Sequence, residues 1–442
     1  MDEKYDDERD FRVVPSKDGK SAVITKYTGK KQTVIIPPHL HGLPVTSIGN
    51  EVFKEKEIIR ITIPDSVTSI EASAFAKNLL ISVTIPESVT SIGKEAFGEC
   101  SSLASVTISE GVTSIGEGAF SGCSSLVSVT IPSSITSIGK EAFAGCNSFA
   151  SVAISEGVTS IGEGAFYGCS SLASITIPSS VTSIGKEAFA GCNSFASVTI
   201  SEGVTDIGEG AFYGCSSLTS ITIPESVTSI GDRAFSGCSS FTSITIPESV
   251  TSIGYGAFVG CESLTNIKVA AGNPNYTSEG GILYNKDKTE IVAYPSASGN
   301  IIIPEGVTAI GYCAFVWCSS LTSITIPSSV TSIEGSAFAE CRSLTSVTFI
   351  GERAFFEIFL PSLGPLSIGY EGLEDTHKDH REDLGSSIEE CTRTRPLSGD
   401  LSRISIHYSA FWRCNNLSTV TVFGRTRVKD FFSSAVEIIY SD

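Results

Sequence analysis

The sequence predicts a mainly β solenoid, in which coils of 22–23 residues stack into one elongated array. Three observations predict it. A 23-residue unit, seen cleanly in residues 100–122, recurs in register as far as residue 260; a cysteine opens each copy; and the apolar residues inside each copy keep the same spacing. A fixed period of this length is typical of solenoids, in which each repeat packs on its neighbours. The repeat cysteines are Cys100, Cys123, Cys146, Cys169, Cys192, Cys215, Cys238 and Cys261, with the same spacing again between Cys318 and Cys341.

Each unit predicts two short strands joined by turns. In the copy that starts at Cys100, Val106 and Ile108 alternate with polar residues, as in a half-buried strand. Glycine or proline then indicates a turn, and residues 112–116 form a second short extended segment. Ala119 and Phe120 close the coil. One coil buries too little apolar surface to offset the conformational entropy of its residues, so neighbouring coils must share a core.

The order of motifs predicts five regions. Residues 1–10 are an acidic, disordered tail; residues 11–53 are an N-terminal cap and the first coil; and residues 54–349 are the array. Within the array, residues 268–303 predict a hairpin that projects from the stack, with a polar turn at 285–288. Residues 350–403 predict an irregular linker, and residues 404–442 a last coil and a C-terminal cap with a short helix over 428–438.

The cysteines indicate packing rather than cross-linking. There are thirteen, an odd number, and ten occupy one repeat position. A disulfide framework scatters its partners, whereas this pattern places identical thiols in a column, so we expect buried free thiols. A column also lacks the tetrahedral ligand set that zinc requires. His377 and His380 could contact a metal in a charged loop, but a solvated segment is the favoured interpretation, and we expect no metal or cofactor.

Charge and hydropathy exclude some classes of partner. The formal net charge is −18 and the isoelectric point is about 4.8, so the surface repels phosphate backbones and we expect no nucleic-acid partner. An elongated acidic chain is expected to be soluble and monomeric, although the same charge could select basic partners or cations. The sequence contains no run of 18 apolar residues, so we expect no membrane span. Residues 1–10 do not resemble a signal peptide, which leaves open whether the chain is exported.

Two groups of residues are candidates for ligand binding. One is a row of outward-facing threonines on the first strand of successive coils: Thr107, Thr130, Thr176, Thr199, Thr222, Thr245 and Thr325. The row is either an ordinary solvated sheet face or a continuous ligand surface, which Ala153 and Lys268 would interrupt. The other group is Tyr276, Tyr284 and Tyr294 in the insertion. These tyrosines either anchor a partner or pin the hairpin to its neighbours.

The motif C-x-x-L-x-x-[IV]-x-I-P-x-x-V-T-x-I-G-x-x-A-F, as in residues 215–235, resembles the BspA-like leucine-rich repeats. The cap at residues 11–53 and the insertion also look like those of that family. The resemblance implies a right-handed leucine-rich-repeat solenoid with short strands and few short helices. It also implies a secreted or surface-attached protein that adheres to host matrix proteins such as fibronectin and fibrinogen. It supplies no catalytic motif.

These observations favour a non-enzymatic protein-binding module, of the adhesin type, at the cell surface or secreted. The alternative is an intracellular scaffold of the same fold, in the cytoplasm, which the free thiols and the missing signal peptide favour. An enzyme is a third hypothesis, because residues 356–403 are the one stretch of non-repeated polar residues.

Overall fold

The computed structural model describes residues 5–350, 355–359, 403–407, 409–423 and 436–441. These residues form two compact units, Met1–Asn275 (unit 1) and Tyr276–Asp442 (unit 2). The sequence had predicted one continuous array, and the division falls at the insertion. Each unit is mainly β, and the single helical element of the described residues is the 3-10 helix η1 (Glu8–Asp10).

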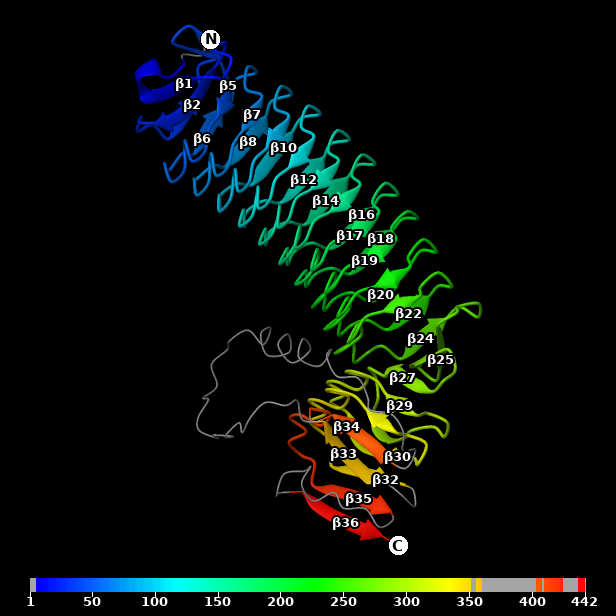
Figure 1. The fold of residues 1–442 in the computed structure, drawn as a ribbon. Helices are drawn as coiled ribbons and strands as arrows, with labels where there is room; N and C mark the ends of the chain where they lie inside the picture. The colour runs from blue at the N-terminus through cyan, green and yellow to red at the C-terminus, as the bar shows by residue number, and fades with distance from the viewer. Residues whose placement is uncertain (1–4, 351–354, 360–402, 408, 424–435, 442) are drawn as a thin grey trace. The chain divides into compact units, whose positions relative to one another are not determined.

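Unit 1 is a stack of coils in which each coil contributes one strand to each of two parallel sheets (Figure 1). The nine-stranded sheet contains the longer strands. Like residues pair with like in it, as in Ser105↔Ser82 and Thr107↔Thr84. Its members are β8 (Ser82–Ile85), β10 (Ser105–Ile108), β12 (Ser128–Ile131), β14 (Ser151–Ile154), β16 (Ser174–Ile177), β18 (Ser197–Ile200), β20 (Ser220–Thr222), β22 (Ser243–Ile246) and β24 (Asn266–Val269).

The thirteen-stranded sheet carries the second strand of each coil and begins in the N-terminal cap. Its cap strands are β1 (Phe11–Pro15), β2 (Ala22–Tyr27) and β5 (Leu43–Ile48), with β4 (His39–Leu40) antiparallel to β5. The two-residue strands that follow are β7 (Ser69–Ile70), β9 (Ser91–Ile92), β11 (Ser114–Ile115), β13 (Ser137–Ile138), β15 (Ser160–Ile161), β17 (Ser183–Ile184), β19 (Asp206–Ile207), β21 (Ser229–Ile230) and β23 (Ser252–Ile253). A further pair, β3 (Thr33–Ile35) and β6 (Arg60–Thr62), completes unit 1.

A column of stacked phenylalanine rings forms the core of unit 1. Successive rings lie 5.1–5.9 Å apart between centroids and within 12° of parallel. The rings are buried and come from one position in ten successive coils: Phe53, Phe75, Phe97, Phe120, Phe143, Phe166, Phe189, Phe212, Phe235 and Phe258. This column confirms the predicted stacking of identical residues.

The repeat cysteines form a second buried column beside the rings. The twelve described cysteines are all free and buried, as predicted. In unit 1 each thiol donates a hydrogen bond to the carbonyl oxygen of a phenylalanine in the preceding coil, at 3.0–3.3 Å, as in Cys192 Sγ to Phe166. Most of these carbonyl groups also accept a backbone N–H, as Phe166 does from Cys169 at 3.1 Å, so the buried thiol donor is paired and adds a second bond to the carbonyl.

The buried thiols predict a loss of stability in alkaline solution. Burial raises the pKa of Cys192 from 9.0 to about 12, and that of Cys238 likewise to about 12. Above pH 9 the unfolded chain releases thiol protons that the folded chain keeps, so the free energy of unfolding should fall as the pH rises from 9 towards 12. Urea unfolding of the wild type and of Cys192→Ala over this range tests the claim. The variant should show a shallower decline, and identical slopes would contradict it.

The N-terminal segment differs from the predicted disordered tail. From residue 5 onwards it is part of the cap, because the buried Asp6 carboxylate accepts hydrogen bonds from the Ile35 backbone N–H, at 2.9 Å, and from Lys31. The Asp6 N–H donates in turn to the Ile35 carbonyl, at 3.1 Å. The segment thus covers the outer edge of β3. Residues 1–4 lie outside the described residues.

The insertion also differs from the predicted projecting hairpin. It forms three strands, β25 (Tyr276–Glu279), β26 (Ile282–Asn285) and β27 (Glu290–Ala293), which are antiparallel to one another in order. β27 then pairs in parallel with the next coil, so the insertion is built into a seven-stranded sheet. Tyr284 and Ile291 belong to the core of unit 2 and hold the insertion there, and Leu283 is also buried.

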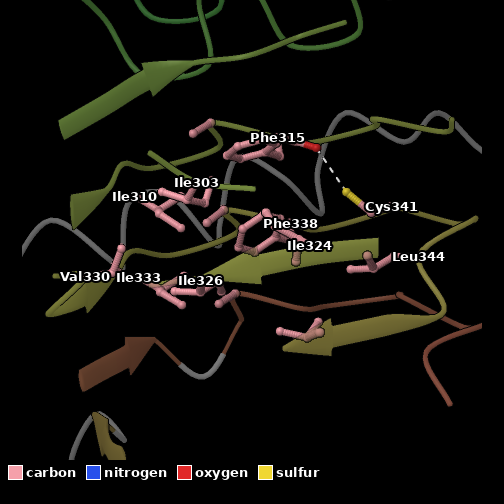
Figure 2. Packing of buried hydrophobic residues seen from close by; sticks show 14 of the residues in the cluster. Ile303, Ile310, Phe315, Ile324, Ile326, Val330, Ile333, Phe338, Cys341 and Leu344 are labelled. Carbon is pink, nitrogen blue, oxygen red and sulfur yellow. Dashed lines mark hydrogen bonds between the residues drawn. The ribbon is translucent and has the colours of Figure 1, made fainter. Parts of the chain in front are cut away.

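Unit 2 contains a mixed seven-stranded sheet and a parallel five-stranded sheet around one core. The seven-stranded sheet continues from β27 through β29 (Ala309–Ile310), β31 (Ser332–Ile333) and β34 (Arg403–His407) to β33 (Phe355–Phe359). The five-stranded sheet contains β28 (Gly299–Ile302), β30 (Leu321–Ile326), β32 (Ser346–Phe349), β35 (Thr419–Phe423) and β36 (Glu437–Ser441). Figure 2 shows Phe315, Phe338 and their aliphatic neighbours between the sheets, and the Cys341 thiol donating to the Phe315 carbonyl, at 3.1 Å.

Two further predictions for the C-terminal part need correction. Part of the predicted linker, Phe355–Phe359, is strand β33, paired with β34. The end of the predicted helix lies in strand β36, which pairs with β35. Residues 351–354 and 360–402 of the predicted linker, and residues 428–435 of the predicted helix, lie outside the described residues.

Candidate ligand-binding face

The outward side chains of strands β8 to β22 form a flat surface of hydroxyl groups, here called the hydroxyl face. It consists of a threonine row and a serine row, because successive side chains of a strand point to opposite sides and the isoleucines and valines between them point into the core. The threonine row is Thr84, Thr107, Thr130, Ala153, Thr176, Thr199, Thr222 and Thr245, and the serine row is Ser82, Ser105, Ser128, Ser151, Ser174, Ser197, Ser220 and Ser243. All these outward positions are uncharged.

The structure brings most of the predicted threonines together. Thr107, Thr130, Thr176, Thr199, Thr222 and Thr245 are exposed and share the hydroxyl face. Thr325 does not share it, because it is half-buried in β30 of unit 2, beside Ile302 and Thr348. The prediction also missed Thr84. The sequence could have revealed Thr84, because residues 82–85 have the same Ser-Val-Thr-Ile pattern as residues 105–108, although their coil has 22 residues.

A second threonine row lies beside the thirteen-stranded sheet, directly before its two-residue strands, and its hydroxyl groups are bonded within the protein. Its hydroxyl groups donate hydrogen bonds to the threonine carbonyl of the preceding coil, as in Thr159 Oγ1 to Thr136, at 3.0 Å. The same bond recurs at 3.0–3.4 Å in Thr68, Thr90, Thr113, Thr136, Thr182, Thr205, Thr228 and Thr251. By contrast, within the described residues no side-chain hydrogen bond involves the threonines of the hydroxyl face. Their hydroxyl groups are therefore available to water or a ligand.

Charged residues lie beside the hydroxyl face rather than on it. The turns that follow its strands carry the exposed carboxylates of Glu87, Glu110, Glu156, Glu202, Glu225 and Glu248. Some of them are held in place, because Ser133 Oγ donates to Glu110 at 3.0 Å and lowers the pKa of that carboxyl group. The hydroxyl face thus has an acidic border along one side.

A second row of charged residues lies a few residues before the core phenylalanine of successive coils. Lysine and glutamate alternate there from coil to coil and form pairs between neighbouring coils. The separations are 3.1 Å for Lys94 and Glu117, 3.0 Å for Lys140 and Glu163, and 3.0 Å for Lys186 and Glu209. The pairs are exposed, so each contributes little to stability. Their effect is to distinguish two kinds of coil.

The three candidate tyrosines are not an exposed cluster. Tyr284 is only 3% exposed and belongs to the core of unit 2. Tyr294 is half-buried against Phe315, with 5.6 Å between ring centroids, and Tyr276 is half-buried in β25. Tyr284 is therefore not available as an exposed ligand-binding residue, and both Tyr284 and Tyr294 fit the alternative in which the tyrosines pin the insertion to its neighbours.

The structure offers no sign of a metal centre or membrane helix in the residues it describes. No three His, Cys, Asp or Glu side chains of these residues gather closely enough to bind a metal ion. None of these residues belongs to a helix of the length and apolar character needed to span a bilayer.

The comparisons with known proteins agree with the fold. Residues 46–173, 159–279 and 293–360 match the BspA type Leucine rich repeat region, with six copies. A leucine rich cell surface protein from Faecalibacterium prausnitzii is 31% identical, over 79% of this chain and 95% of that one, with a TM-score of 0.52.

More distant structures were also found. A leucine-rich repeat protein from Bacteroides ovatus is 21% identical over the full length of both chains, with a TM-score of 0.46. A leucine rich repeat protein of T. pallidum is 25% identical over 59% of this chain and 91% of that one, with a TM-score of 0.29. None of the curated proteins compared is similar enough to count as a match. The family model matches well over half of the chain's residues, and the coils of the chain stack as described above. The chain therefore belongs to the BspA-type leucine-rich repeat family.

Proposed function

We propose that the chain is a non-enzymatic protein-binding module of the adhesin type, and that the hydroxyl face of unit 1 is its ligand surface. The observation that carries the proposal is the contrast between the two threonine rows. The threonines beside the thirteen-stranded sheet donate their hydroxyl groups to carbonyl groups of the preceding coil. The threonines of the hydroxyl face, along strands β8 to β22, make no such bond. A long row of free donors and acceptors suits a long, flat partner surface.

The chemistry of the hydroxyl face favours binding over catalysis. Its groups are the same hydroxyl repeated along the stack, whereas a catalytic site needs different groups converging at one place. Its uncharged centre costs less to desolvate than a charged surface would, provided that the partner supplies hydrogen bonds to the hydroxyl groups. Its acidic border would select a partner with basic residues along one side. The partner we propose is an extracellular-matrix or cell-surface protein, bound by a monomer of this chain.

Binding to immobilised fibronectin and fibrinogen tests the proposal. The double variant Thr130→Arg/Thr176→Arg places two bulky charges on the hydroxyl face and should weaken binding at least about tenfold, which is about 1.4 kcal/mol. The matched control Thr136→Arg/Thr182→Arg makes the same changes in the same coils, beside the other sheet. Equal losses in both variants would contradict the assignment of the face, and no binding of the wild type to either protein would contradict the adhesin proposal.

We propose a secreted or cell-surface location, which the cell-surface description of the Faecalibacterium prausnitzii protein supports. The second candidate is an intracellular scaffold, which the twelve free thiols favour because reducing compartments keep thiols free. Protease treatment of intact cells followed by fractionation separates the two. Loss of the chain on treatment supports the surface location, and full protection inside the cell supports the scaffold.

A further inference from the structure

A cluster of tryptophan and arginine side chains lies on one edge of unit 2, at the turn that follows the core phenylalanine of each coil. The chain contains two tryptophans, Trp317 and Trp412, and both lie at this turn. Trp317, Glu340 and Arg413 occupy the same left-handed backbone position in three stacked coils, with φ of 60°, 59° and 56°. In the middle coils of unit 1 the same position is glycine, as at Gly168, with φ of 69°.

One buried carboxylate orders two arginines. Glu340 is 6% exposed, and its two oxygens accept hydrogen bonds from Arg342 Nε and Arg413 Nη1, each at 3.0 Å. The arginine side chains themselves are 71% and 41% exposed. A guanidinium group has five N–H donors, and Glu340 takes one from each. The group of three side chains therefore has a net positive charge and presents further donors to the solvent.

An aromatic ring lies directly beside these donors. The Arg413 guanidinium is stacked over the Trp412 ring, 4.3 Å from its centroid, and Trp412 is 38% exposed. Stacking fixes the plane of the guanidinium group, so less side-chain entropy is lost when it binds a second carboxylate. Tryptophan and arginine are also the residues most enriched among those that dominate protein interfaces.

We infer that Trp412, Arg413 and Arg342, called here the Trp/Arg patch, bind an acidic peptide segment of a partner protein. A carboxylate of the segment would accept paired N–H groups from a guanidinium that Glu340 holds in place, and a neighbouring apolar side chain would cover Trp412. The positive charge of the patch selects an acidic partner. The patch differs in this from the protein as a whole, whose formal net charge is −18. The inference does not depend on the hydroxyl face, which belongs to unit 1.

Tryptophan fluorescence of the full chain reports on this patch, because one of its two tryptophans, Trp412, belongs to the patch and the other, Trp317, lies at the corresponding turn two coils away. The probe is a synthetic peptide of aspartate and glutamate around one phenylalanine, and its control replaces the acidic residues with asparagine and glutamine. We expect saturable quenching or a shift of the emission with the acidic peptide and none with its neutral counterpart. An equal response to both peptides, or no response to either, would overturn the inference.

Variants separate recognition from folding. Arg342→Gln should weaken peptide binding about tenfold, and the double variant Arg342→Gln/Arg413→Gln should abolish it. The matched control Arg60→Gln removes an exposed arginine from β6 of unit 1 and should leave the affinity unchanged. If the double variant fails to fold, the single variant Arg342→Gln tests the inference. It should fold, because the buried Glu340 carboxylate keeps its hydrogen bond from Arg413. Wild-type affinity in a folded Arg342→Gln variant would rule the patch out, and this outcome leaves fibronectin or fibrinogen binding by unit 1 unaffected.

Discussion

Replacing Phe166 with alanine is expected to destabilise unit 1 by about 3–5 kcal/mol. The ring is fully buried in the middle of the column, with its centroid 5.5 Å from that of Phe143 and 5.3 Å from that of Phe189. The neighbouring coils cannot close the gap, because their spacing is fixed by the backbone bonds of both sheets. Removal of the ring therefore leaves a cavity and breaks the contact between the two halves of the stack. Urea unfolding monitored by circular dichroism measures the change.

The matched control for Phe166→Ala is Thr176→Ala in the next coil. Thr176 is exposed on the hydroxyl face, so its replacement should change the free energy of unfolding by no more than about 0.5 kcal/mol. Because each coil packs only on its neighbours, the Phe166→Ala variant should also unfold less cooperatively. A Phe166→Ala variant as stable as Thr176→Ala would contradict the central role of the phenylalanine column.

Replacing Gly162 with alanine should destabilise unit 1 by about 3 kcal/mol, near the upper end of typical overpacking costs. A Cβ atom at this position would lie 2.8 Å from the Gly139 carbonyl carbon, the Ile138 carbonyl oxygen and the Lys140 nitrogen. These atoms belong to the backbone of the preceding coil, so no side-chain rotation can relieve the clash. The coils would have to separate. Thermal and urea unfolding provide the measurement.

Gly19→Ala is the control for Gly162→Ala. Gly19 has a φ of +72°, which disfavours alanine by roughly 1–2 kcal/mol, but a methyl group added there would meet no atom within 4 Å. Gly162 has no such dihedral constraint. If close approach of neighbouring coils matters more than the dihedral angle, Gly162→Ala will be the less stable of the two variants. The reverse order would show that the coils can adjust their spacing.

The structure of the coil could be predicted from the sequence, because the same spacing of apolar residues recurs in many copies and each copy supports the same interpretation. Phe120, Phe143 and Phe166 stack as identical positions should, and the repeat cysteines are free and buried. The outward direction of Thr107 and its equivalents also followed from strand alternation alone.

What the sequence could not predict depends on contacts that occur only once. Tyr284 is of a residue type that often anchors a protein partner. Its ring is buried because β27 joins the seven-stranded sheet and carries the paired strand β26 with it into the core. Asp6 is part of an acidic stretch, and only the open edge of β3 gives it a partner. The two threonine rows have the same residue type, and their difference appears only when the hydroxyl partners are known.

The alternation of lysine and glutamate from Lys94 to Glu209 gives the stack a period of two coils. A deletion of 23 residues, such as 146–168, would bring the coil of Lys140 next to that of Lys186, and Glu141 next to Glu187. Like charges would then face each other across the new junction. Loss or gain of 46 residues, the distance from Cys146 to Cys192, restores every opposite pair. A change of two coils within residues 94–209 therefore keeps opposite charges next to each other, whereas a change of one coil does not. Because the pairs are exposed, the difference in stability between the two products should be small.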